Sequence, residues 1–486
     1  MIFGILIVFL IFVATIHWYW TIPNYLPPGP LGLPFLGHFV IWDQMHKKFV
    51  NIGKKYGPIF CFYRFSKLVV VINDYDIIRQ AMVKQGDGFT RKLDDNIPYR
   101  VLRLKEGLLY VDGDRWHEQR RFALSTLRKL GIGRSVLEDL ISDEIHQALN
   151  ILSEKAENGE SFDAEPILQG LVANISCRTI FGKRYDYYDQ KFTELVQLVS
   201  TATRQANLGI LLGIQDWFRL IPFVNGTWNR VVKRQQKLHK LFKDFIEDCE
   251  ATCSEQTDGY SYIDAFRKQQ AADTGSYFTN DQLLFATRDL FAASLDTTSN
   301  TLLWAILLCI VYPHVQKRCQ EELDAAHQAG EDPRWQDRQR TPYVEATIME
   351  VQRFSSVLAF LSRGASRDVE VGPYKIPKGA AVFVNTSAVH MNEKYFPNPT
   401  EFNPERFLDS ENKIVGSRTE MLLPFGLGKR VCLGEGLARM ELYLVYATLL
   451  RHFTFRIPPN APMPSLKPMA AITLHPYPFK VIVERR

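Results

Sequence analysis

One cysteine of the sequence follows two glycines in a segment suited to close contact with a flat ligand. Cys432 ends the run PFGLGKRVC, and glycine allows both positive φ angles and close backbone approach. A helix is predicted from Leu433 to His452, which would place the thiol at a helix N-terminus, where N–H groups and the dipole favour a thiolate. A thiolate is a ligand for haem iron. The alternative is a glycine-rich turn that ends in a buried cysteine.

An acid and a hydroxyl lie in the middle of the longest apolar helix that the sequence predicts, residues 281–311. Within it the run FAASLDTT places Asp296 and Thr297 where a polar group would be costly without a purpose. The cost of burying such a pair indicates that these two residues have a function beyond packing. The alternative is a threonine that hydrogen-bonds to the preceding helical turn.

Two further pairs have helical spacing. Glu350 and Arg353 are three residues apart in a predicted helix, and Arg406 follows in the loop NPERF. Trp116 and Arg120 are four residues apart, which places an indole and a guanidinium on one helical face. Taken alone, either pair could be an ordinary exposed pair on a helix surface.

Together these segments resemble the cytochrome P-450 family, closest to its microsomal, drug- and hormone-metabolising family 2 clan. The spacing F-x-x-G-x-R-x-C-x-G from Phe425 to Gly434 is similar to the haem-binding signature of that family, and the other motifs follow the family's order. The resemblance covers nearly the whole chain. It implies haem b (iron protoporphyrin IX) as cofactor, O2 as co-substrate, and Cys432 as the axial ligand of the iron.

The resemblance also implies roles for the other residues. Thr297 would hydrogen-bond the bound dioxygen while Asp296 relays protons with water, although Ser294 stands where the family usually has glycine. The ions Glu350, Arg353 and Arg406 would form a buried structural network, because a lone buried charge is costly. The predicted cofactor-binding residues are Trp116, Arg120, Arg363, Phe425, Arg430 and Cys432, with Arg363 in a position that is histidine in many members.

By the same similarity, a predominantly apolar pocket would accept the substrate. Its predicted lining residues are Ile97, Leu108, Phe291, Ala292, Ala293, Val357, Leu358, Phe360, Ala471 and Ile472. Such a pocket fits fatty acids, steroids, isoprenoid hormones and foreign compounds equally well.

The first 20 residues contain no charged side chain and are long enough to cross a bilayer as a helix. We therefore expect a transmembrane anchor at 1–20, a proline-rich hinge at 21–38 and the catalytic domain at 39–486. A cleavable signal peptide is the alternative, but it requires a basic start and a small-residue cleavage site. Lys47, Lys48, Lys54 and Lys55 place the body on the cytoplasmic side by the positive-inside tendency, here of the endoplasmic reticulum membrane.

The predicted fold is mostly α with a smaller β-rich part, in a single compact catalytic domain behind the anchor. Residues 59–72 are rich in aromatic and β-branched types and predict a strand pair. Apolar periodicity predicts helices within 137–152, 164–181, 231–250 and 281–311. Later segments predict a strand at 380–385 and a closing hairpin at 472–484.

Composition limits the partners. The formal charge of +5 is small for 486 residues and no basic tract occurs, so nucleic acid is not expected. Seven scattered cysteines fit a reducing compartment. No dinucleotide or flavin fingerprint occurs, so NADPH would be used indirectly, through NADPH-cytochrome P-450 reductase, with cytochrome b5 as a second candidate partner. The basic residues proposed to steer a reductase are Arg121, Arg128, Lys129 and Lys429.

The sequence thus predicts a monooxygenase that inserts one oxygen atom from O2 into a lipophilic substrate, by hydroxylation or epoxidation. Two other functions compete with it. A haem-thiolate isomerase or dehydratase would rearrange a peroxide without a reductase, and a carrier of lipid or haem would keep the fold without catalysis. Neither of these needs the pair formed by Asp296 and Thr297.

Overall fold

The computed structural model of the chain describes residues 23–33, 37–38, 44–65, 67–92, 106–131, 135–212, 222–252, 261–272, 277–469, 471 and 473–486. The predicted anchor at 1–20, part of the hinge, Ile97 and Ile472 lie outside these residues. Helices predominate, as predicted. The chain divides into two compact units, each described by itself: unit 1 contains Met1–Asp94, Ala359–Pro397 and Phe425–Cys432, and unit 2 contains Asp95–Leu358, Asn398–Pro424 and Leu433–Arg486.

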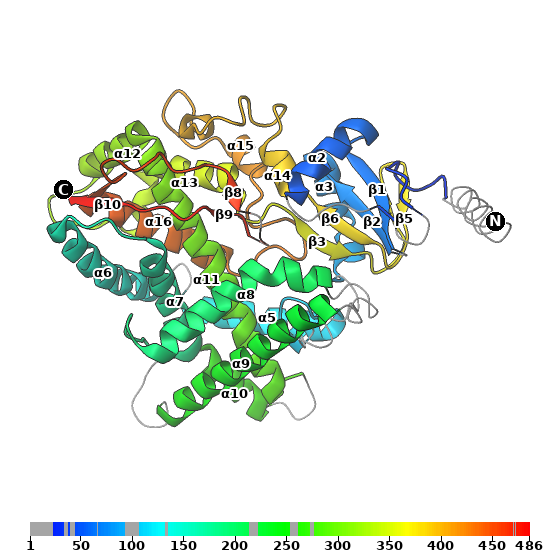
Figure 1. Cartoon of the computed structure of the whole chain (residues 1–486), viewed down its shortest axis with the longest axis horizontal. Helices are drawn as coiled ribbons and strands as arrows, with labels where there is room; N and C mark the ends of the chain where they lie inside the picture. The colour runs from blue at the N-terminus through cyan, green and yellow to red at the C-terminus, as the bar shows by residue number, and fades with distance from the viewer. Residues whose placement is uncertain are drawn as a thin grey trace. The chain divides into compact units, whose positions relative to one another are not determined.

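Unit 1 is built on a four-stranded sheet in the order β1-β2-β6-β3 (Figure 1). β1 (Ile59–Arg64) and β2 (Lys67–Ile72) form the predicted antiparallel hairpin, and β6 (Ala381–Val384) pairs parallel to β2 and antiparallel to β3 (Leu361–Gly364). The β-branched residues of β2 are buried, as expected for a central strand. α2 (Met45–Tyr56) packs Phe49 against Phe60 and Phe383.

Shorter elements complete unit 1. They are α3 (Tyr75–Arg79), the π-helical turn η1 (Gln80–Lys84), the 3-10 turn η2 (Gly86–Phe89), the pair β4 (Val369–Val371) and β5 (Tyr374–Ile376), and α14 (Thr386–His390).

Unit 2 is helical around α11 (Asn280–Val311), whose first turn is capped by Thr279 accepting from the N–H of Gln282. α11 packs against α7 (Glu165–Phe181), α8 (Gln190–Leu212), α9 (Pro222–Thr252) and α16 (Glu435–His452). All four predicted helical segments are confirmed. The remaining elements are α5 (Gly113–Lys129), α6 (Ser135–Asn158), α10 (Tyr262–Ala272), α12 (Pro313–Ala326), η5 (Trp335–Gln339), α13 (Pro342–Ser355), η6 (Pro404–Phe407), α15 (Gly416–Glu420), β7 (Phe453–Arg456), β8 (Pro468–Met469), β9 (His475–Pro476) and β10 (Ile482–Arg485).

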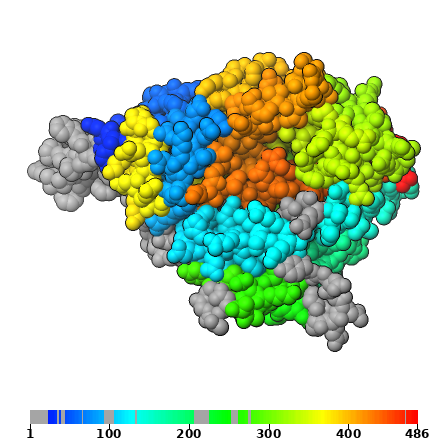
Figure 2. Space-filling view, turned by 180° about the vertical axis from the view of Figure 1, so that it is seen from behind, coloured from blue at the N-terminus to red at the C-terminus, as the bar shows by residue number. Residues whose placement is uncertain are grey.

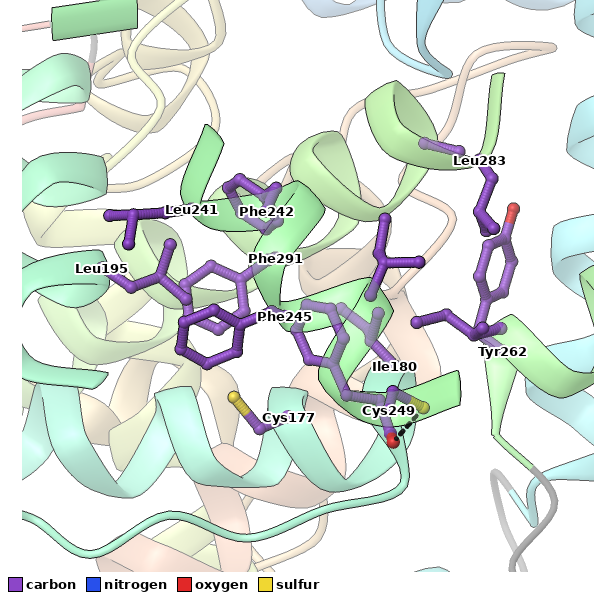
Figure 3. Packing of buried hydrophobic residues seen from close by; sticks show 14 of the residues in the cluster. Cys177, Ile180, Leu195, Leu241, Phe242, Phe245, Cys249, Tyr262, Leu283 and Phe291 are labelled. Carbon is purple, nitrogen blue, oxygen red and sulfur yellow. Dashed lines mark hydrogen bonds between the residues drawn. The ribbon is translucent and has the colours of Figure 1, made fainter. Parts of the chain in front are cut away.

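Aromatic residues fill the core between α7, α9 and α11. Figure 3 shows Phe242, Phe245 and Phe291 directed toward one another, with ring centroids of Phe242 and Phe291 5.7 Å apart. Cys249 packs here as a small apolar residue, and its thiol donates to the carbonyl of Phe181 at 3.0 Å. This core fixes the helix that carries Asp296.

Among the described residues, α11 is the one helix long and apolar enough to cross a bilayer. Because 83% of its 18-residue apolar stretch is buried inside the protein, α11 is a core helix.

Two predictions near the C-terminus are wrong, one about the start of a helix and one about strand pairing. α16 begins at Glu435 with Gly434 as its N-cap, so Leu433 precedes the helix. The closing segment is not a hairpin on itself: β10 pairs with β7, and β9 pairs with β8. Pro476 and Pro478 lack the N–H groups that a hairpin ladder needs, which explains why this segment finds partners elsewhere.

Candidate active site

The cysteine segment of unit 1 is a tight loop held by its own backbone. The N–H of Cys432 donates to the carbonyl of Phe425 at 2.9 Å, and that of Val431 donates to Gly428 at 3.0 Å. Gly426 and Gly428 have φ angles of 75° and 80°, which glycine adopts without strain. A Cβ on Gly428 would lie 1.9 Å from the carbonyl oxygen of Met82, so this close approach requires glycine.

Cys432 differs from the other described cysteines in exposure. Cys61, Cys177, Cys249, Cys309 and Cys319 are buried, whereas Cys432 is exposed. Burial raises the pKa of the Cys61 and Cys309 thiols to about 12, so both stay protonated and inert. Cys432 is the described cysteine whose sulfur is accessible to a ligand, and an accessible sulfur on a glycine-shaped loop fits an iron porphyrin in donor chemistry and in shape.

Two arginines gather beside this loop. Arg363, on β3, is 4% exposed and donates to the carbonyl of Ser362 at 2.9 Å and to that of Arg430 at 3.4 Å. Arg430 donates through Nε to the carbonyl of Thr90 at 2.8 Å. Guanidinium groups bind carboxylates strongly, so this arrangement suits the carboxylates of a porphyrin.

α5 of unit 2 carries the predicted indole and guanidinium on one face. Trp116 is buried, and the guanidinium carbon of Arg120 lies 5.8 Å from the centre of its ring. The predicted i,i+4 geometry is confirmed. In Figure 2, α5 forms a broad cyan strip on the molecular surface.

At the centre of α11 the two candidate catalytic residues have different surroundings. Asp296 is 4% exposed, and its Oδ1 and Oδ2 accept from the hydroxyls of Thr203 (2.8 Å) and Thr473 (2.5 Å). Thr297 is half-buried and donates to the carbonyl of Ala293 at 2.8 Å, the back-bonded geometry considered as the alternative. Ala293 is exposed although it lies in the middle of a buried helix. Thr297 therefore lies one helical turn from Ala293, an exposed position of α11.

Ser294, where the family usually has glycine, bonds to the neighbouring helix. Its Oγ lies 2.6 Å from the Oγ of Ser176 on α7, and the Ser176 hydroxyl donates to the carbonyl of Val172. The hydroxyl group of Ser294 therefore forms a hydrogen bond between α11 and α7.

The predicted charge network is present in unit 2. Arg353 donates to both oxygens of Glu350 at 2.7 Å, and Arg406 donates to Oε1 at 3.0 Å. The N–H of Asn403 also donates to Oε1, and the carbonyl of Glu401 accepts from both arginines. The side chains of Glu350 and Arg353 have no exposed surface, and each of the three charged groups has at least one partner of opposite charge.

The predicted pocket residues have varied positions. Leu108 and Phe291 lie in the buried core of unit 2, and Val357 is also buried. Ala292, Leu358 and Ala471 are half-buried, and Ala293 is exposed. In unit 1, Phe360 is half-buried and packs on Phe49 and Phe383.

Sequence reasoning missed an acid that holds the loop before α5. Oδ2 of Asp289 accepts from the N–H groups of Leu108 at 2.8 Å and Leu109 at 3.0 Å, while Arg288 donates to Oδ1 at 2.7 Å. It also missed the partners of Asp296. One signal was available: Asp296, Asn300 and Trp304 recur every four residues along an apolar helix, which predicts one polar buried face.

Comparison with known proteins gives one consistent result. A sequence model of the Cytochrome P450 family matches residues 27–483, which span both units as one domain. The chain is 32% identical to Cytochrome P450 2U1 of Bos taurus, over 96% of this chain and 91% of that protein. It is 34% identical to Cytochrome P450 2J2 of Homo sapiens, over 93% and 90%, and 34% identical to Cytochrome P450 2C25 of Mesocricetus auratus, over 89% and 88%.

Proposed function

Because this chain belongs to the cytochrome P450 family, we propose that Cys432 supplies the thiolate that holds its haem iron. The protein is a haem-thiolate monooxygenase, an oxidoreductase that uses haem b and O2, with electrons that come from NADPH through a reductase. The observation that carries the assignment of Cys432 is its exposure in a glycine-shaped loop beside Arg363 and Arg430, while the other described cysteines are buried.

Each of the predicted cofactor-binding residues would have its own role in holding the haem. Cys432 would bind the iron, Phe425 would pack at the loop, and Trp116, Arg120, Arg363 and Arg430 would bind the porphyrin carboxylates through charge-assisted hydrogen bonds. When bound, the haem supplies the site at which dioxygen is cleaved and one oxygen atom is transferred to the substrate.

Asp296 and Thr297 would manage the protons. The hydroxyl of Thr297 can leave the carbonyl of Ala293 by rotation about its Cα–Cβ bond and would then be able to hydrogen-bond a ligand. Asp296 is held by hydroxyl groups, which can both donate and accept, so its carboxylate can exchange a proton without leaving its place. A peroxide-rearranging isomerase or a carrier would have no use for this pair.

The substrate would contact the accessible and half-buried apolar residues among those predicted. These are Ala292, Ala293, Leu358, Phe360 and Ala471. Leu108, Phe291 and Val357 would support this lining from the core. Their apolar character suits the lipophilic substrates that the family oxidises.

For the redox partner, we propose NADPH-cytochrome P450 reductase, with cytochrome b5 as a second donor. Arg121, Arg128 and Lys129 are exposed on α5 and can attract an acidic surface. Lys429, in unit 1, is also exposed, but its Nζ pairs with Oδ1 of Asp87 at 2.9 Å. This ion pair reduces the positive charge that Lys429 can offer to an acidic partner. For location, we propose the endoplasmic reticulum membrane, with residues 1–20 as the anchor and the catalytic part in the cytoplasm.

Reconstitution with a reductase in phospholipid vesicles under 18O2 tests the function. We expect NADPH-dependent product that contains one 18O atom for a lipophilic substrate, and no product with Cys432→Ala. Product formed from a lipid hydroperoxide without reductase would instead indicate an isomerase. Tight binding of lipid with no turnover would indicate a carrier.

A further inference from the structure

One face of α11 holds the segment 473–475 in place. Asp296, Asn300 and Trp304 lie on this face at four-residue intervals. Asn300 Nδ2 and Trp304 Nε1 both donate to the carbonyl of Leu474, at 3.0 and 2.8 Å, and the N–H of Leu474 donates to the carbonyl of Val357 at 2.7 Å. The backbone between Thr473 and His475 is therefore fixed against α11.

This anchoring brings His475 to the carboxylate of Asp296. His475 Nε2 lies 3.0 Å from the hydroxyl oxygen of Thr473 and 3.5 Å from Oδ1 of Asp296. Asp296, Thr473 and His475 are 4%, 3% and 2% exposed, so solvent does not compete for these hydrogen bonds.

Counting protons fixes the direction of the bonds. The hydroxyl of Thr473 has one proton, and its 2.5 Å contact with Oδ2 of Asp296 is the stronger, charge-assisted bond. The Thr473 oxygen must then accept at its other contact, so His475 Nε2 must carry a hydrogen and donate it. His475 Nδ1 is buried and has no hydrogen-bond partner among the described residues, so Nε2 is the ring atom that these residues engage.

The charges around His475 agree with a neutral ring. Burial lowers its pKa, the charge of Asp296 on α11 opposes this, and the charge of Arg204 on α8 lowers the pKa further. Arg204 itself pairs with Glu165 on α7. The hydrogen-bond count requires hydrogen on Nε2, and burial favours the neutral form of that ring.

We propose that His475 is a positioning residue for the monooxygenase reaction, which acts through Thr473 to hold the carboxylate of Asp296. The inference rests on the proposed role of Asp296. If the hydrogen were on Nδ1, Nε2 would become an acceptor and would compete with Asp296 for the only proton of Thr473. The protonated nitrogen of His475 thus decides whether Oδ2 of Asp296 keeps its donor.

A pair of substitutions separates positioning from packing. Glutamine can place an amide N–H near the Nε2 position, whereas leucine fills similar space without a donor. We expect His475→Leu to lower the product formed per NADPH consumed by about tenfold, because a misplaced proton-relay group costs heavily. His475→Gln should stay within about twofold of wild type, since the donor to Thr473 is kept. Equal losses in both variants, or no loss in either, would overturn the proposal.

A double substitution tests whether His475 acts through Asp296. In an Asp296→Asn background, His475→Leu should cause little further loss of coupling, because residues that act as one unit are not additive. A full, independent tenfold loss in that background would contradict the proposal.

Nitrogen-15 spectra of histidine-labelled protein give a readout independent of turnover. With His475→Gln to assign the signal, we expect Nε2 protonated and Nδ1 unprotonated at neutral pH. A ring with hydrogen on Nδ1 and none on Nε2 would overturn the inference. The carbon-monoxide spectrum of each variant separates this from the haem assignment: a thiolate band retained in His475→Leu attributes its loss of coupling to the relay, whereas failure of the wild-type band would concern Cys432 alone.

Discussion

Glu350 and Asp296 are both buried carboxylates of unit 2, but cations hold the first and hydroxyls hold the second. Two guanidinium groups and a backbone N–H bind Glu350. Asp296 is bound by Thr203 and Thr473, with His475 close by. Because a guanidinium does not release its proton, the partners of Glu350 offer no route for proton transfer and suit a structural role. Hydroxyl groups can both donate and accept protons, so the surroundings of Asp296 suit proton transfer.

Glu441 on α16 extends the comparison. It is 1% exposed, and neither of its side-chain oxygens has a hydrogen-bond partner in the described part of the chain. Burial raises the pKa of this carboxyl to about 8. Burial without a hydrogen-bond partner thus favours the neutral form of Glu441. Glu350 and Asp296 each have hydrogen-bond donors, which Glu441 lacks in the described part of the chain.

Removing a cation from the Glu350 network should have the largest effect. Arg353→Ala leaves Glu350 buried with less compensation, and breaking such a pair costs about 3–5 kcal/mol. We expect thermal unfolding far below that of wild type and little haem-loaded protein. Lys413→Ala, which breaks an exposed pair with Glu411, is the matched control and should behave as wild type. Normal stability of Arg353→Ala would mean that the network is dispensable.

Asp296→Asn should affect turnover and leave the fold intact. Asparagine can accept from one threonine but cannot take up and release a proton, and loss of a general acid–base group costs about 100-fold or more. Product formed per NADPH consumed is the measurement, with peroxide release as the counterpart. The contrast between Glu350 and Asp296 would fail if Asp296→Asn left the product formed per NADPH consumed unchanged while Arg353→Ala still unfolded the protein. Asp296 would then have no role in turnover.

The variant Glu441→Gln tests whether Glu441 makes the stability of the fold depend on pH. The folded-state pKa lies above the ordinary value of 4.5, so the stabilising contribution is complete below about pH 4.5 and is lost as pH rises toward about 8. Glutamine does not titrate, so the variant should gain on wild type by about 1.4 kcal/mol per pH unit within this window. Denaturant unfolding at pH 6 and pH 7 measures the difference. Parallel stability curves would show that Glu441 has a partner in solution.

Ser294 should give the smallest effect. Ser294→Ala removes the contact with Ser176 but leaves Ser176 bonded to Val172, so we expect a loss of about 1 kcal/mol in unfolding free energy. Ser294→Gly should cost about 1 kcal/mol more through helix propensity. An increase in stability of Ser294→Gly would show that the serine strains α11.

The sequence predicted the parts of the site that depend on local spacing. The cysteine segment, the Glu350–Arg353 pair and the Trp116–Arg120 face are short patterns, and the structure places each pair as expected. It did not predict the contacts of Thr473 and His475 with Asp296, because these residues are far apart along the chain, 177 positions for Thr473 and Asp296. The direction of the Ser294 hydroxyl and the pairing of β10 with β7 are likewise set by neighbouring elements rather than by local sequence.

The carbon-monoxide difference spectrum of the reduced, membrane-expressed protein tests the central claim most directly. Wild type, Cys432→Ala and the matched control Cys309→Ala, which replaces a buried thiol, would be compared with a histidine-ligated haem protein. We expect a strongly red-shifted Soret band in wild type and in Cys309→Ala, and its loss in Cys432→Ala. A histidine-like band in wild type, or a red-shifted band that persists in Cys432→Ala, would contradict thiolate ligation by Cys432.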